Sequence, residues 1–228
     1  MGGGLRALQA AAGLISLLAL SACELKAAPA GGFAGDAAAG QALAVRVCSA
    51  CHGLAGDPVS PAVPRLAGQY PEYLQKQLLA FRTGPGGKPK RLSPVMAPIA
   101  AALSLSDIAN VAAWYADQPA GHSGARDPRR LELGRRVYLE GDPGRDLPAC
   151  VACHRPTGTG VRPDFPVVGG QSPDYLDDQL ANWEARRGHP GKLMSLIVPH
   201  LAPDEREAVA DYIAELRPDR SQPSIASR

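Results

Sequence analysis

The chain has 228 residues, of which 45% are hydrophobic and 20% charged, with a formal net charge of +2. This composition is typical of a globular protein of one or two domains, and the net charge is too small to indicate a nucleic-acid-binding protein. Aromatic residues make up only 5% of the chain, which is little to fill two cores, so a large apolar cofactor would supply the missing volume.

The N-terminus is predicted to be an export signal. Arg6 gives a positive start, and the apolar run from Ala10 to Leu20 is too short to span a bilayer but has the usual length of a signal-peptide core. The residues Leu20-Ser21-Ala22-Cys23 resemble the lipobox of bacterial lipoproteins, in which the cysteine is lipidated and becomes the first residue of the mature chain. We therefore predict a signal peptide over residues 1–22 and lipidation of Cys23.

Residues 23–35 are rich in Ala, Gly and Pro and are predicted to tether the folded part to this anchor. The alternative is an ordinary secretory signal cut after Ala28 or Ala30, which would discard Cys23. Both interpretations predict export to the periplasm, and the first adds anchoring to a membrane.

Helical patterns follow along the rest of the chain, and no alternating strand pattern is present. The predicted helices cover residues 36–50 with Asp36 as N-cap, 71–82, 104–118, and a last segment that begins near Pro203 and ends at Pro218. The sequence therefore predicts an all-α, loop-rich fold.

The chain contains an internal repeat. Cys48-Ser49-Ala50-Cys51-His52 and Cys150-Val151-Ala152-Cys153-His154 stand 102 residues apart. The same spacing aligns Pro64 with Pro166, Gly68-Gln69 with Gly170-Gln171, Tyr73-Leu74 with Tyr175-Leu176, Gln77-Leu78 with Gln179-Leu180, and Phe81 with Trp183. We predict two tandem domains over 36–119 and 130–218, a linker over 120–129, and a disordered tail over 219–228.

The Cys-x-x-Cys-His motif is the attachment pattern for c-type haem. Two thiols on one helical turn reach both vinyl groups of a porphyrin, and the following histidine comes under the iron. Zinc sites and thioredoxin-like sites also use Cys-x-x-Cys, but neither explains a histidine after both pairs. The motifs predict two haem c groups, attached through Cys48, Cys51, Cys150 and Cys153, with His52 and His154 as iron ligands.

The sixth iron ligand decides between electron transfer and catalysis. Apart from Met1, the sequence has two methionines, Met96 and Met194, and they align when the repeat spacing contracts by four residues. A thioether ligand raises the reduction potential of a haem and leaves no open position for oxygen or peroxide. We predict these methionines as the sixth ligands; the rival candidates, which lack counterparts in the other unit, are His122, His189 and His200.

With these motifs, the region from about residue 36 to 216 resembles the cytochrome c4 family, in which two class I cytochrome c domains are fused. The resemblance implies that the carbonyl groups of Pro64 and Pro166 accept hydrogen bonds from the haem histidines, and that Leu66 and Val168 pack against the haems. Gly40 and Gly134 look like the family's first-helix glycines, with Trp114, Tyr115 and Tyr212 as their last-helix partners.

The resemblance also implies an electron carrier rather than an enzyme. Its partners would be redox proteins such as a cytochrome bc complex, a terminal oxidase or a dehydrogenase. Two alternatives remain at this point: an electron-relay subunit of a larger dehydrogenase, and a dihaem oxidoreductase such as a peroxidase or a thiosulfate-oxidising protein.

Basic residues cluster before each predicted methionine ligand. These are Lys88, Lys90 and Arg91 in the first unit, and Arg186, Arg187 and Lys192 in the second. They either surround an exposed haem edge and steer an acidic partner, or belong to ordinary solvated loops.

Overall fold

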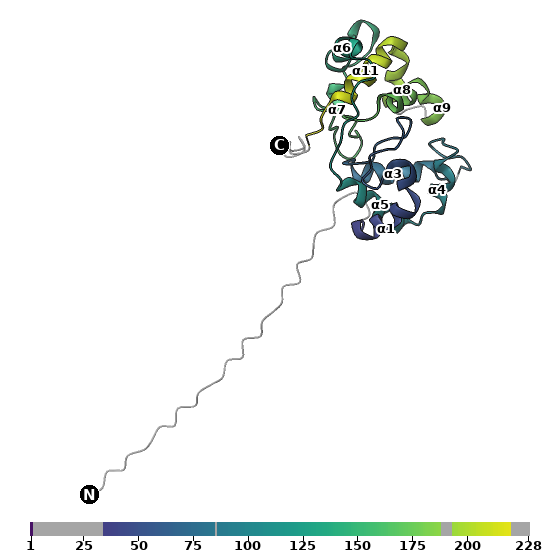
Figure 1. Cartoon of the computed structure of the whole chain (residues 1–228), viewed down its shortest axis with the longest axis vertical. Coiled ribbons are helices and arrows are strands. Elements are labelled where there is room, and N and C mark those ends of the chain that lie inside the picture. The colour runs from purple at the N-terminus through teal and green to yellow at the C-terminus, as the bar shows by residue number, and fades with distance from the viewer. Residues whose placement is uncertain (2–33, 85, 188–192, 220–228) are drawn as a thin grey trace.

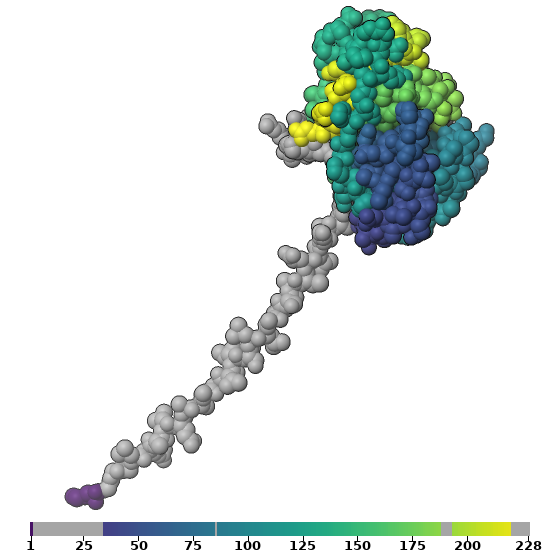
Figure 2. All heavy atoms as spheres, in the orientation of Figure 1, coloured from purple at the N-terminus to yellow at the C-terminus, as the bar shows by residue number. Residues whose placement is uncertain are grey.

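The computed structural model describes residue 1 and residues 34–84, 86–187 and 193–219. Residues 2–33, which include Cys23 and most of the predicted signal and tether, lie outside the described residues, as do His189, Lys192 and residues 220–228 of the predicted tail. The described residues form two helical units that lie one on the other; the first runs from blue to teal and the second from teal to yellow in Figure 1, and Figure 2 shows them packed together. They contain no strand, only three isolated bridges, which confirms the all-α fold.

The first unit contains five helices: α1 (Ala37–Val47), α2 (Ser49–His52), α3 (Pro71–Phe81), α4 (Met96–Ala102) and α5 (Leu105–Ala116). Asp36 caps α1 through its side chain, which accepts from the backbone N–H groups of Ala38 and Ala39, and Ser104 caps α5 in a capping box with Asp107. These starts agree with the predictions. The helix predicted over 36–50, however, is interrupted at Cys48, so that the first haem motif begins a separate turn.

The second unit repeats this order with additional short turns. Its elements are η1 (Pro128–Arg130), α6 (Leu131–Leu139), η2 (Pro143–Arg145), α7 (Val151–His154), α8 (Pro173–Ala181), α9 (Trp183–Arg187), α10 (Leu193–Ile197), η3 (Val198–His200) and α11 (Pro203–Glu215).

In both units the first and last long helices cross at a glycine. A Cβ atom at Gly40 of α1 would overlap the carbonyl oxygen of Asn110 on α5, and one at Gly134 of α6 would overlap that of Ala208 on α11. The side chains of Trp114 and Tyr212 adjoin these two crossings. The glycine–aromatic pairing implied by the family resemblance is therefore present in both units.

The two cores are filled differently. Tyr138 of α6 is fully buried, donates to the carbonyl oxygen of Arg155 at 2.6 Å, and packs its ring 5.4 Å from that of Tyr212. The first unit has Ala44 at the corresponding place, four residues after its crossing glycine, and packs it with Leu74 and Tyr115. At this one position the first core therefore contains less side-chain volume than the second.

The segment predicted as a linker is bound to the second unit. The backbone N–H of Gly124 donates to Ala214 and that of Ala125 to the Glu215 carboxylate. The carboxylate of Asp211, which has no exposed surface, accepts from both the backbone N–H and the Nε of Arg126, at 3.0 and 3.1 Å. These bonds fix the connection between the units along α11.

No single helix in the described part of the chain is both long and apolar enough to span a membrane. The consecutive helices α4 and α5 meet the length and composition criteria only as a pair, and that pair is bent by 116°.

Candidate functional site

The first Cys-x-x-Cys-His motif begins at Cys48, the residue directly after α1, and continues through α2 to His52. Helix α1 ends at Cys48, whose backbone N–H donates to Ala44, and a new turn starts there because His52 donates its backbone N–H back to the Cys48 carbonyl at 3.0 Å. One turn thus carries both thiols and the histidine. Gly53 continues the chain at φ 71°, a left-handed conformation that glycine adopts without strain.

His52 is held in one orientation. Its Nδ1 lies 3.0 Å from the carbonyl oxygen of Pro64, and only 8% of the residue is exposed. Because a carbonyl only accepts, Nδ1 carries the proton, and Nε2 is left with a free lone pair. Burial lowers the pKa of His52, and the bond to Pro64 only partly opposes this, so the ring is neutral at neutral pH and able to coordinate a metal.

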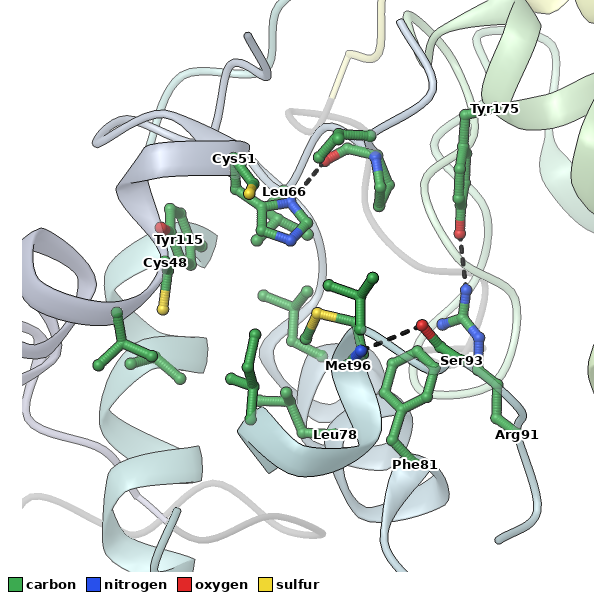
Figure 3. A pocket seen from close by; sticks show the side chains of 18 of the residues that line it. Cys48, Cys51, Leu66, Leu78, Phe81, Arg91, Ser93, Met96, Tyr115 and Tyr175 are labelled. Carbon is green, nitrogen blue, oxygen red and sulfur yellow. Dashed lines mark hydrogen bonds between the residues drawn. The ribbon is translucent and has the colours of Figure 1, made fainter. Parts of the chain in front are cut away.

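A cavity of about 300 Å³ opens beside this histidine. Cys48, Cys51 and Met96 face it in Figure 3, and the aliphatic side chains around it include Leu66 and Leu78. Helix α4 supplies Met96 at its first position, where the backbone N–H donates to Ser93 Oγ at 3.1 Å. The structure therefore brings the predicted residues of the first site together around one apolar space.

Each site has one half-buried cysteine whose pKa is raised, Cys48 in the first and Cys150 in the second. Burial raises the pKa of Cys48, and it raises the pKa of Cys150 to about 11. Both are therefore thiols rather than thiolates at neutral pH. No three His, Cys, Asp or Glu side chains among the described residues converge as metal ligands would.

The second motif has the same local geometry. Helix α7 carries Cys153 and His154, and His154 Nδ1 lies 3.2 Å from the carbonyl oxygen of Pro166. Burial lowers the pKa of this histidine as well. Cys150 and Val168 pack against the core of the second unit, and Met194 lies half-buried on α10.

Of the rival histidine ligands, the two that the structure describes, His122 and His200, do not line the first cavity. His122 is exposed, and both of its ring nitrogens lie beside the Arg217 guanidinium, at 3.3 and 3.0 Å. His200 ends the turn η3 and is half-buried, while His189 lies outside the described residues.

The prediction for the basic clusters is wrong for two of their members. Arg91 and Arg187 are buried between the two units, so neither surrounds an exposed edge nor belongs to a solvated loop. Arg91 donates to Tyr175 at 2.8 Å and to Gln179 at 3.1 Å, both on α8 of the second unit, and Figure 3 shows the Tyr175 contact. Arg187 reaches the first unit in return, donating to Gln77 at 3.1 Å.

This interface also borders the first site. Besides Arg91 of the first unit, the cavity wall includes Tyr175, Gln179 and Arg186 of the second. The second unit therefore completes the surroundings of the first site. Burial acts to raise the pKa of Tyr73 at the same interface, but the positive charges of Arg187 and Arg91 hold it below its usual value. The sequence contains a signal for these residues, since Tyr73, Gln77, Tyr175 and Gln179 match across the repeat.

The first cavity suits a flat, largely apolar cofactor with a metal at its centre. Its wall combines aliphatic side chains with a neutral imidazole and a thioether, which coordinate iron, and with two thiols placed on one turn. The guanidinium of Arg91 adds a positive charge at one end of the wall, where it would balance a cofactor carboxylate.

Comparison with known proteins gives a consistent result. The cytochrome c family model matches the chain twice, over residues 37–117 and 131–217. Cytochrome c4 from Thiocapsa roseopersicina is 37% identical over 186 residues, which cover 80% of this chain and 93% of the relative. The thiosulfate dehydrogenase electron acceptor from Stutzerimonas stutzeri is 40% identical over 178 residues, 76% of this chain and 80% of the relative.

Solved structures agree with these matches. Reduced recombinant cytochrome c4 from Pseudomonas stutzeri superimposes with a TM-score of 0.72 at 34% identity, covering 80% of this chain and all of that chain. A chain of thiosulfate dehydrogenase from Marichromatium purpuratum gives a TM-score of 0.67 at 36% identity, covering 83% of this chain but 43% of that one.

Proposed function

Because this chain belongs to the cytochrome c family, and its cytochrome c4 homologues are dihaem electron-transfer proteins, we propose which of its residues hold the two haems and which redox partners exchange electrons with them. The chain is a dihaem c-type cytochrome that carries electrons. The observation that best supports this function is the first cavity, where two thiols, one imidazole and one thioether share an apolar wall.

Attachment is assigned to Cys48 and Cys51 in the first domain and to Cys150 and Cys153 in the second. Each thiol would add across one vinyl group, so that a carbon–sulfur bond forms and the thiol hydrogen passes to the neighbouring carbon, with no oxidant required.

The iron ligands are assigned to His52 with Met96, and to His154 with Met194. The bonds to Pro64 and Pro166 fix each imidazole with Nε2 free for the metal, and make it a more basic ligand. Leu66 lines the first cavity, and we assign Val168, which packs against the core of the second unit, to the equivalent place at the second haem. Haem supplies reversible one-electron chemistry, and six-coordination leaves no position for a substrate.

The ligand assignment is tested on the full chain produced in a host that attaches haem c. We expect two haems per chain that survive denaturation and acid extraction, and the weak far-red band of methionine-ligated ferric haem. Met96→Ala and Met194→Ala should each remove about half of that band, because each changes one of two sites. His122→Ala is the matched control and should leave the band unchanged. An intact band in either methionine variant contradicts the assignment.

We also propose that the chain is exported to the periplasm and anchored through lipidated Cys23. The support is the sequence alone, since the apolar run ends directly before the lipobox-like residues. Mass spectrometry of the N-terminal peptide should find a lipid on Cys23, and Cys23→Ser should release the protein from membranes. A mature chain that starts after Ala28 or Ala30 would contradict lipidation but not export.

The proposed partners are other redox proteins of the periplasm. The relatives named thiosulfate dehydrogenase electron acceptors favour a dehydrogenase as donor, whereas the cytochrome c4 relatives fit a carrier between a cytochrome bc complex and a terminal oxidase. Reduction of the purified protein by each candidate donor, followed by stopped-flow spectroscopy, distinguishes them. A donor whose rate does not exceed that of a small-molecule reductant is excluded.

A further inference from the structure

In each domain, the peptide unit that holds the haem histidine is also held by the opposite domain. The carbonyl oxygen of Pro64 lies 3.0 Å from His52 Nδ1. The N–H of the same peptide unit belongs to Arg65 and donates to the side-chain oxygen of Gln171, in the second domain, at 2.8 Å. A glutamine of the second domain and the histidine of the first therefore share one peptide group.

The second domain shows the reciprocal arrangement. The carbonyl oxygen of Pro166 lies 3.2 Å from His154 Nδ1. The N–H of Val167, in that peptide unit, donates to the side-chain oxygen of Gln69, in the first domain, at 3.0 Å. Gln69 and Gln171 stand at equivalent repeat positions, so the two contacts are related by the pseudo-twofold relation of the domains.

Both glutamines are fixed by further bonds. Gln171 Nε2 donates to the Arg65 carbonyl at 3.0 Å, and Gln69 Nε2 donates to the Val167 carbonyl at 2.8 Å, so each side-chain amide pairs with a backbone as a neighbouring strand would. Each Oε1 also accepts from the backbone N–H of the following residue: Gln69 from Tyr70, and Gln171 from Ser172. Only 6% of Gln69 and 8% of Gln171 is exposed, and these partners leave one amide orientation for each.

A peptide unit transmits the effect of such a bond. Its N–H and C=O groups are conjugated and point in opposite directions, so an acceptor at the N–H increases the negative charge on the oxygen. A stronger acceptor at Pro64 draws the Nδ1 proton of His52 more strongly and makes the imidazole a better electron donor at Nε2. A more basic imidazole favours ferric over ferrous iron, and so lowers the reduction potential.

We infer that Gln69 and Gln171 are positioning residues that act crosswise: each sets the ligand strength of the haem histidine, and thereby the reduction potential, in the domain to which it does not belong. This inference rests on the proposed function, in which His52 and His154 coordinate the haem irons. It gives the interface a part in electron transfer, since a shift of the domains would alter the potentials of both haems.

The test is a redox titration of the full holoprotein, followed by NMR so that each haem's methyl signals are assigned to a domain. Gln171→Leu should raise the potential of the first-domain haem, with a change in its reduction equilibrium on the order of threefold, which is about 28 mV for a one-electron couple. Gln69→Leu should raise that of the second-domain haem. In the reduced protein, the Nδ1–H resonance should move upfield only for the histidine of the opposite domain.

Two further variants separate this effect from loosening of the interface. Ser172→Ala is the matched control, because it removes the hydrogen bond to the Pro61 carbonyl across the same interface without touching the Pro64–Arg65 peptide. It should shift neither potential. Gln171→Glu places a stronger, charged acceptor at the Arg65 N–H and should lower the potential of the first-domain haem, so it tests the inference should the leucine variant fail to fold.

The inference is overturned if Gln171→Leu, or Gln171→Glu in its place, shifts the haem of its own domain, shifts both haems equally, or behaves as Ser172→Ala does. Absence of covalent haem from the unsubstituted protein would instead overturn the proposed function. The two failures are distinguished by the haem content measured before titration.

Discussion

Removing the haem from the first domain alone should unfold that domain. The perturbation is the pair of substitutions Cys48→Ser and Cys51→Ser, which removes both attachment points and leaves the second motif intact. An empty cavity of about 300 Å³, at about 24 cal/mol for each Å³, corresponds to a loss of about 7 kcal/mol of stability. A domain of this size has a free energy of unfolding of about 5–15 kcal/mol, so the loss consumes half or more of it.

The first domain has little with which to replace that volume. Its buried cluster consists of Ala44, Leu74, Ala112 and Tyr115, and the position that Tyr138 fills in the second domain holds an alanine. Collapse of the surrounding helices would therefore have to move α1 or α4 by a large distance. We expect the helices to separate instead.

Far-UV circular dichroism and urea unfolding measure the outcome, after extraction confirms one haem per chain. The helical signal should fall by about half, because the two units contribute similar numbers of helical residues. Met96→Leu is the control, since it retains the attached haem and nearly the same side-chain volume, and should keep the full signal. The reasoning would be refuted by a one-haem variant that retains the full helical signal and whose urea unfolding midpoint lies within about 0.5 M of that of the parent protein.

Three substitutions test the packing on which the sites depend. Gly40→Ala directs a methyl group at the Asn110 carbonyl where α1 crosses α5, and should destabilise the holoprotein by about 2 kcal/mol, measured by urea unfolding. Tyr138→Phe removes the hydroxyl donor to Arg155 and should cost about 1–2 kcal/mol by the same measurement, with no change in haem content. Asp211→Asn weakens the bonds that hold Arg126, and should cost about 2 kcal/mol and increase proteolysis within residues 120–129. If the free energy of unfolding of a variant equals that of the parent protein, the contact that it changes does not have the stabilising role proposed here.

The haem motifs could be predicted from the sequence because attachment requires a fixed local spacing. Two thiols and a histidine within five residues already define one turn, whatever surrounds it. The roles of Gly40 and Gly134 were implied by the family resemblance, and the structure supplies the physical reason, since a Cβ atom at either would overlap a backbone carbonyl oxygen of the crossing helix. In these cases a short segment or a single steric requirement determines the outcome.

Helix α4 was not predicted, and the reason is local. Its seven residues include Pro98, which usually ends a helical pattern, but this proline is the third residue of the helix, where a backbone N–H has no helical partner to lose. The break at Cys48 was missed for a related reason. Residues 36–50 have continuous helical propensity, and the tertiary requirement to turn the thiols toward the cavity overrides it.

The domain interface was the largest omission, although the repeat contained its signature. Polar residues repeated in two domains are conventionally assigned to solvent. Here Gln69, Gln171 and Gln179 are buried, and Tyr73, Tyr175 and Gln77 are half-buried in contact with arginines at the interface or with the opposite unit. In a pseudo-twofold interface each polar residue that faces the axis meets the counterpart surface of the other unit, so the same residue satisfies both sides. A repeated glutamine or tyrosine outside the cofactor motif is therefore better interpreted as an interface residue than as a solvated one. Gln69 and Gln171 stand five residues after Pro64 and Pro166, and each bonds to the peptide unit that holds the haem histidine of the opposite domain. Contact between the domains would reach the iron ligands in this way, without any residue that touches both haems.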